Sequence, residues 1–375
     1  MKLKFKNGKI RIMQVSDAQD MHFIRPTMFR MLDKAYDTLK PDMIVLTGDN
    51  ILGNHLCDAR FGTKKIIHDK AGEAAVMKTA INYLVAPIEK RGIPFAMIYG
   101  NHDDMNRLTK EEQAEFYREY KGCLGLDDSE SPDVDTYNLP IYSEDGEKIK
   151  FNLWLMASAW RNHEEDRTTE LVKPEAVEWY KKKSAELKEA NGGEVVPSIM
   201  FQHIPLVETL ELIEECPEGV CNSVKGPDDK FYKLKADCKG ELGEYPCTVQ
   251  EKTGQFEAIK ECGDVKAIVF GHDHCNRFEG NIDGIDIIQT SCASFRCYGT
   301  RYRGVRIFDI NEDGTYTTTS YTYEEIMGGG IVNELRYIWD ADEMWKKKIG
   351  LIAGGVLGVA GVTAMGVKAI KALKK

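Results

Sequence analysis

The N-terminus lacks an apolar stretch of signal-peptide length. Residues 1–15 contain lysines and form a basic, strand-like pattern that leads directly into a polar motif. Because a secretory signal needs a continuous apolar core, secretion by a cleaved signal is not expected. The sequence also contains no internal repeat and no low-complexity tract. Its 375 residues can therefore bury a sizeable core, as one large α/β domain or two small ones.

Cysteine is sparse, with ten residues in the chain, and no tight Cys-x-x-Cys pair occurs where four thiols cluster. This number is compatible with reduced thiols in a cytoplasm. The cluster consists of Cys216, Cys221, Cys238 and Cys247. A zinc site and disulfides are both conceivable for it, but the loose spacing favours free thiols.

Basic residues are in deficit, with 50 Lys and Arg against 60 Asp and Glu. The deficit is uneven, since residues 346–375 hold seven lysines and no acid, which leaves 43 basic against 60 acidic side chains in residues 1–345. Nonspecific nucleic-acid affinity comes from basic groups that meet phosphates. We therefore expect no nucleic-acid partner, although bound metal ions would offset the charge locally.

Apolar runs of strand length alternate with helical patterns along the chain. The predicted strands are Ile10–Val15, Met43–Thr47, Phe95–Tyr99, Phe151–Ala157, Ser198–Gln202, Ala267–Phe270 and Ile285–Gln289, with short strands in Arg301–Tyr323. The predicted helices are Pro26–Leu39, Gly72–Glu89, Lys110–Tyr120 and Pro174–Ala190. This alternation predicts an α/β layer structure with functional groups on loops at the carboxyl ends of strands.

Short polar motifs follow five of these predicted strands. They are Ser16-Asp17-Ala18-Gln19, Gly48-Asp49-Asn50, Gly100-Asn101-His102-Asp103, Gln202-His203 and Gly271-His272-Asp273-His274. Carboxylate and amide oxygens with imidazole nitrogens suit Mn²⁺, Fe or Zn²⁺ better than thiolate-seeking metals. The motifs supply enough ligands for two metal ions about 3.5–4 Å apart, an arrangement that cleaves phosphate esters.

This series of motifs resembles the calcineurin-like metallophosphoesterase family over roughly residues 9–310. The family pattern is Asp-x-His, Gly-Asp, Gly-Asn-His-Asp/Glu, a lone His and Gly-His-x-His, and only Gln19 departs from it. The stretch 263–280 further resembles the purple-acid-phosphatase-like branch. Leu52 stands where true purple acid phosphatases carry a tyrosine, so no iron–tyrosinate centre is expected. The resemblance implies an α/β fold, a four-layer αββα sandwich of two mixed β-sheets.

The resemblance also assigns metal ligands, with Asp49 as the bridge between two ions. The first ion would be held by Asp17, Asp49 and His274, with Gln19 at the position of the family's histidine. The second ion would be held by Asp49, Asn101, His203 and His272. Since an amide is a weaker ligand than imidazole, the first ion would be held loosely, be held through water, or be a harder ion. Asp20 and His22 are close enough in sequence to be considered as substitutes.

The same resemblance implies the chemistry. A hydroxide held between the ions would attack phosphorus, because coordination lowers the pKa of bound water. His102 would be the general acid that protonates the leaving alkoxide, and Asp103 would fix its tautomer and orientation.

Two features flank the motifs. Residues 205–252, rich in Pro, Gly, Cys and charge, have no clean period and lie between two ligand motifs, so they predict a lid-like insertion. Arg296, Arg301 and Arg303 follow the last motif. Such arginines either clamp a phosphate oxygen or are solvated strand ends.

A hydrophobic segment lies near the C-terminus. After the linker 326–348, residues 349–367 carry no charge and are followed by the basic tail 368–375. About nineteen residues at 1.5 Å each would cover about 28 Å, which predicts a transmembrane helix. A surface-lying helix and a soluble core helix are the alternatives. Glycines at every fourth position predict a homodimer contact through Gly350, Gly354 and Gly358.

The sequence thus predicts a dinuclear-metal phosphoesterase with a catalytic domain over 1–325, acting on a phosphate mono- or diester. We expect it to be membrane-associated through its C-terminal tail, with the catalytic domain in the cytoplasm. A non-catalytic scaffold on the same fold is one alternative, against which the retained Asn101 and His102 argue. A nuclease or cyclic-nucleotide phosphodiesterase is the other, but the acidic domain and the lack of a nucleotide motif disfavour it.

Overall fold

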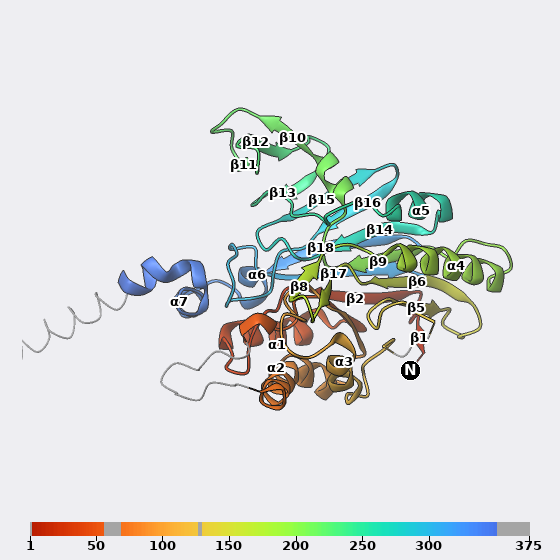
Figure 1. The fold of residues 1–375 in the computed structure, drawn as a ribbon, viewed down its shortest axis with the longest axis horizontal. Helices are drawn as coiled ribbons and strands as arrows, with labels where there is room; N and C mark the ends of the chain where they lie inside the picture. Colours follow the sequence, from red (N-terminus) through yellow and green to blue (C-terminus); the bar gives the residue numbers. More distant parts are fainter. Residues whose placement is uncertain (1, 56–68, 127–129, 351–375) are drawn as a thin grey trace, which may run out of the picture.

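The computed structural model describes residues 2–55, 69–126 and 130–350. Its larger sheet has the strand order β1-β5-β6-β9-β14-β16-β15-β13 (Figure 1). These strands are β1 (Leu3–Lys4), β5 (Tyr137–Tyr142), β6 (Ile149–Met156), β9 (Ser198–Gln202), β14 (Val265–Phe270), β16 (Ile285–Gln289), β15 (Arg277–Ile282) and β13 (Lys239–Glu241). β6, β9, β14 and β16 are parallel, whereas β15 and β13 are antiparallel additions.

The smaller sheet has the order β18-β17-β2-β3-β4. Its strands are β18 (Tyr316–Thr322), β17 (Gly304–Asn311), β2 (Lys9–Val15), β3 (Met43–Thr47) and β4 (Phe95–Ile98). β2, β3 and β4 run parallel, and β17 is antiparallel to both of its neighbours. Both main sheets are therefore mixed, which confirms the predicted mixed α/β class.

The two sheets face each other across a buried layer. Gln14 of β2 donates to the Phe270 carbonyl of β14 at 3.2 Å and accepts from the Thr290 hydroxyl at 2.7 Å. The rings of Phe201 and Phe308 meet edge to face, with centroids 5.7 Å apart. The contact between Gln14 and Phe270 joins β2 and β14, which end in different motifs, so it brings motif loops of both sheets to one region.

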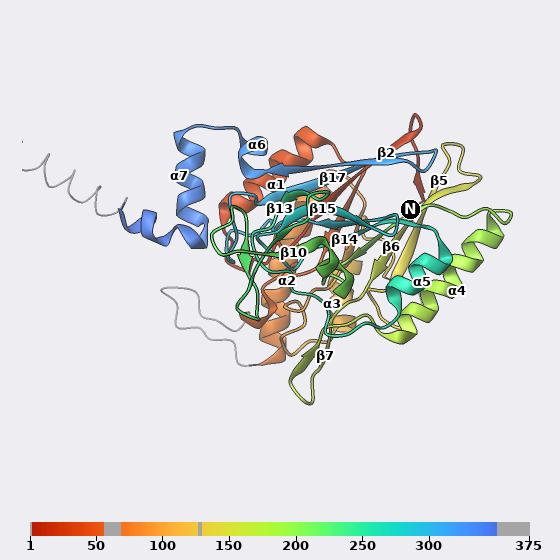
Figure 2. The ribbon, with the colours of Figure 1, turned by 90° about the horizontal axis from the view of Figure 1, so that it is seen from above.

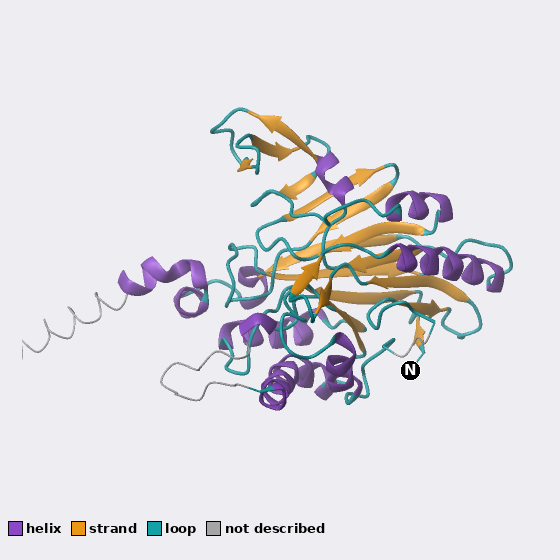
Figure 3. Cartoon of the chain, in the orientation of Figure 1, coloured by secondary structure: helices purple, strands orange, loops and turns teal. Residues whose placement is uncertain are grey.

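Helices cover the outer faces of the two sheets (Figures 2 and 3). α1 (Pro26–Leu39), α2 (Lys70–Lys90) and α3 (Lys110–Arg118) share one core with the smaller sheet. α4 (Pro174–Ala190) and α5 (Gln255–Cys262) share a second core with the outer face of the larger sheet, where Trp179 and Tyr180 pack edge-on against Trp154. Helix ends follow local signals, since α1 and α4 begin with proline and α3 has a Thr109–Glu112 capping box.

The predicted insertion carries a small antiparallel sheet that projects beyond β13 in Figure 1. It is built from β10 (Ile213–Cys216), β12 (Phe231–Leu234) and β11 (Val224–Lys225), after the short helix η2 (Val207–Leu212). A hairpin of β7 (Trp160–Asn162) and β8 (Arg167–Thr169) lies earlier in the chain, and η1 (Gly53–His55) follows β3. The four clustered cysteines are all free thiols, as the spacing favoured. The role of the insertion as a lid stays a prediction.

The C-terminal part corrects the predicted localisation. After α6 (Tyr323–Met327) come α7 (Ile331–Asp340) and η3 (Asp342–Met344). α7 has ten residues, about 15 Å, and carries charged side chains, so it cannot cross a bilayer. No helix among the described residues is long and apolar enough to span a membrane. This finding contradicts the prediction of membrane association through an apolar C-terminal helix. Residues 351–375, which include most of the predicted span, Gly354, Gly358 and the basic tail, lie outside the described residues.

Candidate metal centre

The motif residues converge at the carboxyl ends of five strands from both sheets. Asp17 follows β2, Asp49 follows β3, and Asn101 follows β4. His203 follows β9, and His272 and His274 follow β14. Because the carboxyl ends of parallel strands meet at one edge of a sheet, the facing sheets bring all of these side chains together.

Several of these residues have left-handed backbone conformations, which non-glycine residues rarely adopt. The φ angles are +50° at Asp17, +32° at Gln19, +48° at Asp49 and +70° at His272. Such conformations cost on the order of 1–3 kcal/mol each and cluster at functional sites. Each sharp turn directs a polar side chain inward at the end of its strand.

Asp17, Asp49 and His274 form one group, in which one ligand atom from each residue lies within 4.8 Å of the others, and all three are buried. His274 Nε2 lies 3.4 Å from Asp17 Oδ1. This group contains the three residues that the resemblance assigned to the first ion.

The residues assigned to the second ion adjoin this group. His203 Nε2 lies 3.2 Å from Asn101 Oδ1 and 3.5 Å from Asp49 Oδ1. The ring of His272 meets that of His203 edge to face, with centroids 5.1 Å apart. Asp49 therefore lies between the two groups, where a bridging carboxylate would have to be.

Backbone contacts orient the candidate ligands. The Nδ1 atoms of His203 and His274 each lie 2.9 Å from a carbonyl oxygen, that of Thr47 and that of Tyr298 respectively. When Nδ1 donates its proton to such a carbonyl, Nε2 keeps the lone pair that a metal needs. The Asp49 carboxylate accepts from the His102 amide at 2.8 Å, and the Asp17 carboxylate accepts from the His272 amide at 3.0 Å.

Burial and charge together shift the pKa values of the site. Burial disfavours the charge on His203, but Asp49 and Asp17 outweigh it and raise the pKa of His203 to about 10. Burial would raise the pKa of Asp49, yet His203 and His102 hold that pKa far below its ordinary value. Burial and the neighbouring His203 lower the pKa of His272 to about 3. The site thus keeps two carboxylates charged and offsets part of that charge with a proton on His203, which a metal ion would displace.

The donor set fits metal ions. Among the described residues, Asp17 Oδ1 and Gln19 Oε1 are buried acceptors without a hydrogen-bond partner, and such atoms are costly unless something binds them. The loops also pack tightly against the ligands: a Cβ on Gly100 would lie 2.1 Å from Asp49 Oδ1, and one on Gly271 would lie 2.7 Å from Asp17 Oδ2. Cations bound by oxygen and imidazole ligands would satisfy this cradle.

Gln19 lies inside the site, and its role as a metal ligand stays a prediction. Its Nε2 donates to Asp49 Oδ2, so it binds the carboxylate that would bridge the ions. Asp20, considered above as a substitute, instead pairs with Arg296 at 2.6 Å and accepts from the Arg25 and Met21 amides. His22 packs edge-on against Phe23.

Asp103 has a different role from the one expected. Its carboxylate accepts from the Ile51 amide at 3.0 Å and from the Gly100 amide at 2.7 Å. It therefore holds the loop that carries Asn101 and His102, and does not fix the His102 ring. Burial and the charge of Asp49 raise the pKa of Asp103 to about 8. In the described part of the chain, the buried Nδ1 of His102 has no hydrogen-bond partner.

The three arginines after the last motif are already engaged in ion pairs. Arg296 binds Asp20, Arg301 binds Glu334, and Arg303 binds Glu343. These ion pairs do not support a role as a phosphate clamp. Arg303 is fully buried, so it is not a solvated strand end, whereas Arg301 is exposed to solvent.

Two contacts of the site have no motif in the sequence. The ring of Tyr298, 53% exposed, stacks on that of His274 with centroids 4.3 Å apart and an interplanar angle of 16°. Glu244, from the return segment of the insertion, accepts from the Tyr298 hydroxyl at 3.0 Å and from the Cys275 amide at 2.7 Å. The last motif itself anchors this segment, because Asp273 accepts from the Cys247 amide. Asn276 likewise accepts from the Gly243 and Glu244 amides. In the sequence, the polar residues Asp273 and Asn276 were the signal for the contact between the last motif and this segment.

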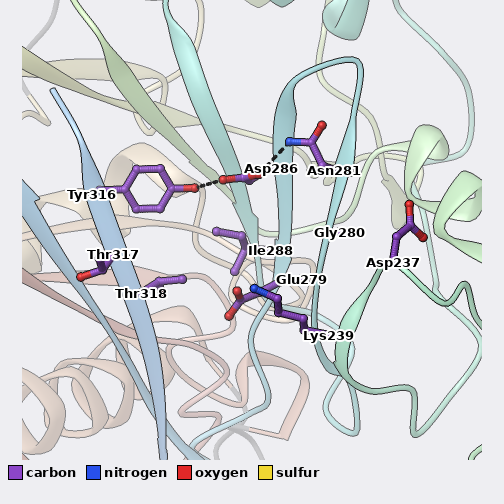
Figure 4. A pocket seen from close by; sticks show the side chains of 10 residues that line it. All are labelled: Asp237, Lys239, Glu279, Gly280, Asn281, Asp286, Ile288, Tyr316, Thr317 and Thr318. Atoms are coloured by element: carbon purple, nitrogen blue, oxygen red, sulfur yellow. Dashed lines mark hydrogen bonds between the residues drawn. The ribbon is translucent and has the colours of Figure 1, made fainter.

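A separate hollow of about 400 Å³ lies between β15, β16 and β18 (Figure 4). Its lining includes Glu279, Asp286 and Tyr316 but none of the motif residues. Asp286 is bound by the Tyr316 hydroxyl and the Asn281 amide, and Glu279 pairs with the buried Arg306. Glu279 and Asp286 thus already have partners.

Comparison with known proteins agrees with this architecture. The family model described as calcineurin-like phosphoesterase matches residues 10–276. The Arabidopsis thaliana proteins named Probable inactive purple acid phosphatase 14 and 29 are each 24% identical to this chain, over 78% and 83% of it and over 72% and 80% of their own lengths. The solved structure titled "GAP50 the anchor in the inner membrane complex of Plasmodium" has a TM-score of 0.50 at 10% identity, covering 85% of this chain and 86% of that one, and shows a similar fold.

The match spans all five motifs and most of both sheets, and the relatives confirm the resemblance to purple-acid-phosphatase-like proteins. The chain belongs to the calcineurin-like phosphoesterase family.

Proposed function

We propose that this protein is a metal-dependent phosphoesterase that binds two metal ions, with residues 1–325 as its catalytic domain in a four-layer αββα arrangement. One observation carries the proposal: two adjoining groups of ligands meet at a buried Asp49. Asp17 Oδ1 supports the same conclusion, because it accepts no hydrogen bond among the described residues and lies 3.4 Å from His274 and 4.0 Å from His203.

Mn²⁺, Fe or Zn²⁺ held by these residues would supply Lewis acidity and an activated water at neutral pH. The two groups are Asp17, Asp49 and His274, and Asp49, Asn101, His203 and His272. The chain itself contributes the proton donor. The His102 amide is fixed on Asp49 at 2.8 Å, and the ring keeps an unpartnered nitrogen within the described residues. His102 then protonates the leaving oxygen of a phosphate mono- or diester.

The substrate is a small phosphate ester and not a nucleic acid. Residues 1–345 carry an excess of acidic side chains, which repels a polyanion. Glu170 and Glu244 lie near the site. The charges of His203 and Asp49 act on the Glu170 carboxylate, and Glu244 accepts a hydrogen bond from Tyr298, whose ring stacks on His274. Both carboxylates disfavour substrates with additional negative charge.

The test is hydrolysis of p-nitrophenyl phosphate and bis-p-nitrophenyl phosphate by metal-stripped protein reloaded with Mn²⁺, Fe²⁺ or Zn²⁺. We expect turnover of both esters that EDTA abolishes, and His102→Ala should strongly reduce the hydrolysis of an alkyl phosphate added to the same assay, because its leaving group needs a proton. His163→Ala is the matched control, because His163 is an exposed residue in the turn between β7 and β8. No turnover of either ester with any of the three metals would contradict the proposal.

A non-catalytic metal-binding scaffold is the second candidate. Gln19 donates to Asp49 Oδ2 where the family's histidine would bind a metal, and the two relatives above carry the word inactive in their names. Stoichiometric binding of two metal ions without turnover of any ester would favour this candidate over the enzyme.

A further inference from the structure

The loop 290–303, between β16 and β17, contacts two residues assigned to the first metal ion. The Ala293 amide donates to the Ser16 carbonyl at 2.8 Å, and the Ser294 amide donates to the Asp17 carbonyl at 3.0 Å. The Ser291 hydroxyl donates to the His274 carbonyl at 2.8 Å. The loop therefore fixes the backbone of Asp17 and of His274 relative to each other.

The same loop orients the imidazole of His274. The Tyr298 carbonyl lies 2.9 Å from His274 Nδ1, and the Tyr298 ring stacks on the imidazole. A proton on Nδ1 leaves the lone pair on Nε2, which faces Asp17 Oδ1 at 3.4 Å. The position of the Tyr298 carbonyl therefore decides whether His274 presents the correct nitrogen to a metal.

Arg303 holds the loop from within. It is fully buried, and its guanidinium donates to carbonyls on both sides of Tyr298. The acceptors are the carbonyls of Ser294, of Cys297 at 2.9 Å and of Thr300 at 3.0 Å. A rigid, planar fork of donors suits this arrangement, and lysine could not reproduce it.

The counter-ion of this buried charge comes from the C-terminal segment, beyond the last motif. Glu343 of η3 binds Arg303 through both oxygens, at 2.6 and 2.8 Å. The Tyr337 hydroxyl of α7 accepts from Arg303 at 2.8 Å and donates to the Thr300 carbonyl at 2.7 Å. α7 is anchored in turn, because Asp340 accepts from the Thr27 amide of α1 at 2.8 Å.

We propose that Arg303 and Glu343 are positioning residues that set the affinity of the first metal ion through the Tyr298 carbonyl and His274. This inference rests on the proposed function. It predicts an asymmetric effect, since hydrogen bonds from the loop reach Asp17 and His274 and, in the described ranges of the chain, none reaches Asn101, His203 or His272. We call the Arg303–Glu343 pair the brace. Substitutions in the brace should lower the affinity for the first metal ion and leave the affinity for the second unchanged.

The experiment is calorimetric titration of metal-stripped full-length protein with Mn²⁺. Glu343→Gln keeps the size of the side chain but removes the counter-charge of Arg303. We expect the affinity for one ion to fall about 10- to 100-fold, the range for outer-shell partners of metal ligands, and the affinity for the other to change by less than about twofold. Glu334→Gln is the matched control, because it breaks the Arg301–Glu334 pair, which joins the same two segments but is 41% and 45% exposed. It should change neither affinity.

A double variant separates positioning from stability. Arg303→Met with Glu343→Leu removes both charges, and replacing a buried ion pair with apolar side chains often preserves folding. Because both charges are removed together, the double variant should melt close to the wild-type temperature. The carbonyls of the loop lack their donor, however, so the variant should bind the first ion more weakly than the wild-type protein does. Arg303→Lys should also bind it weakly, since it retains the charge without the fork.

Two results would overturn the inference alone: wild-type affinities in Glu343→Gln, or an equal loss at both ions that tracks the loss of thermal stability. If the wild-type protein binds no Mn²⁺, the proposed function and the brace fail together. Two wild-type binding events with unchanged affinities in every brace variant would refute only the brace.

Discussion

The two halves of the candidate metal centre are supported in different ways. Asn101, His203 and His272 depend on short loops, and His203 is oriented by the Thr47 carbonyl two residues before Asp49. Asp17 and His274 depend in addition on the 290–303 loop and, through Arg303, on the C-terminal segment. The first half also contains Gln19, the one departure from the family pattern. The comparison teaches that one half follows from motifs alone, whereas the other requires distant parts of the chain.

The largest effect should come from the residue that both halves share. Asp49→Asn leaves the volume unchanged but removes the charge between the two groups. We expect both metal affinities to fall and phosphoesterase turnover to drop by at least roughly 10³-fold, since both ions lose a ligand. Metal content by mass spectrometry and activity on p-nitrophenyl phosphate measure this. Retention of one tightly bound ion would show that the halves are independent.

His102→Ala should separate chemistry from metal binding. Because His102 contributes its amide to Asp49 and its ring to proton transfer, the alanine variant keeps both ions. We expect kcat to fall about 10²- to 10⁴-fold for alkyl phosphates, as for other general acids, and much less for p-nitrophenyl phosphate, whose leaving group needs no proton. An equal loss on both substrates would contradict the role of His102 as the acid.

In the metal-free protein, the second half should make the free energy of unfolding depend on pH, through the raised pKa of His203. The pKa of His203 is raised from 6.5 to about 10, so its stabilisation is complete below pH 6.5 and is lost as the pH rises towards 10. The raised pKa of Asp103, about 8, acts in the same direction from its ordinary value of 3.8 upwards. Between pH 6.5 and 9 the metal-free protein should lose on the order of 5 kcal/mol of unfolding free energy, about 3 through His203 and about 2 through Asp103.

Urea denaturation in EDTA at several pH values measures this loss. Saturating Mn²⁺ should largely remove it, because a metal-bound His203 carries no proton at any of these pH values. His203→Gln in EDTA is the control and should show a flatter profile. A wild-type profile that is flat without metal would contradict the protonated state of His203.

The smallest effect concerns the departure in the first half. Gln19→His restores the family's ligand and removes the donor to Asp49, so the affinity for the first ion should rise about tenfold, within the range of a single ligand or outer-shell change. Gln19→Leu removes the donor to Asp49 without adding a ligand, so it separates the effect of the lost hydrogen bond from the effect of the new imidazole ligand. Titration with Mn²⁺ reports both, and an unchanged affinity in Gln19→His would place Gln19 outside the coordination sphere.

Elements with strong local signals were predicted closely. Met43–Thr47, Ser198–Gln202 and Ile285–Gln289 are strands with the predicted bounds, and Pro26–Leu39 and Pro174–Ala190 are helices with the predicted bounds. Buried parallel strands are continuous apolar runs, and proline marks a helix start. The short strands of 213–234 escaped prediction, because they carry polar residues and pair only with one another.

Predictions of side-chain partners were less successful. Asp103 follows His102 directly, yet its carboxylate binds the Ile51 and Gly100 amides. Arg296, Arg301 and Arg303 bind acids that lie up to 276 residues away in the chain. Proximity in sequence says little about the direction of a side chain once the backbone turns, and the membrane prediction likewise rested on composition without a structural partner.

By itself, the sequence determined the family, the strand–helix order and the candidate metal-ligand residues, because each motif carries potential ligand atoms immediately after an apolar strand. Only the tertiary structure decided how those ligands are oriented and which of them depend on others. Asp49 lies between two groups because two sheets face each other, and His274 is held by a carbonyl that Arg303 and Glu343 keep in place. Burial makes such contacts obligatory, since a charge removed from water must find its partner wherever the fold provides one.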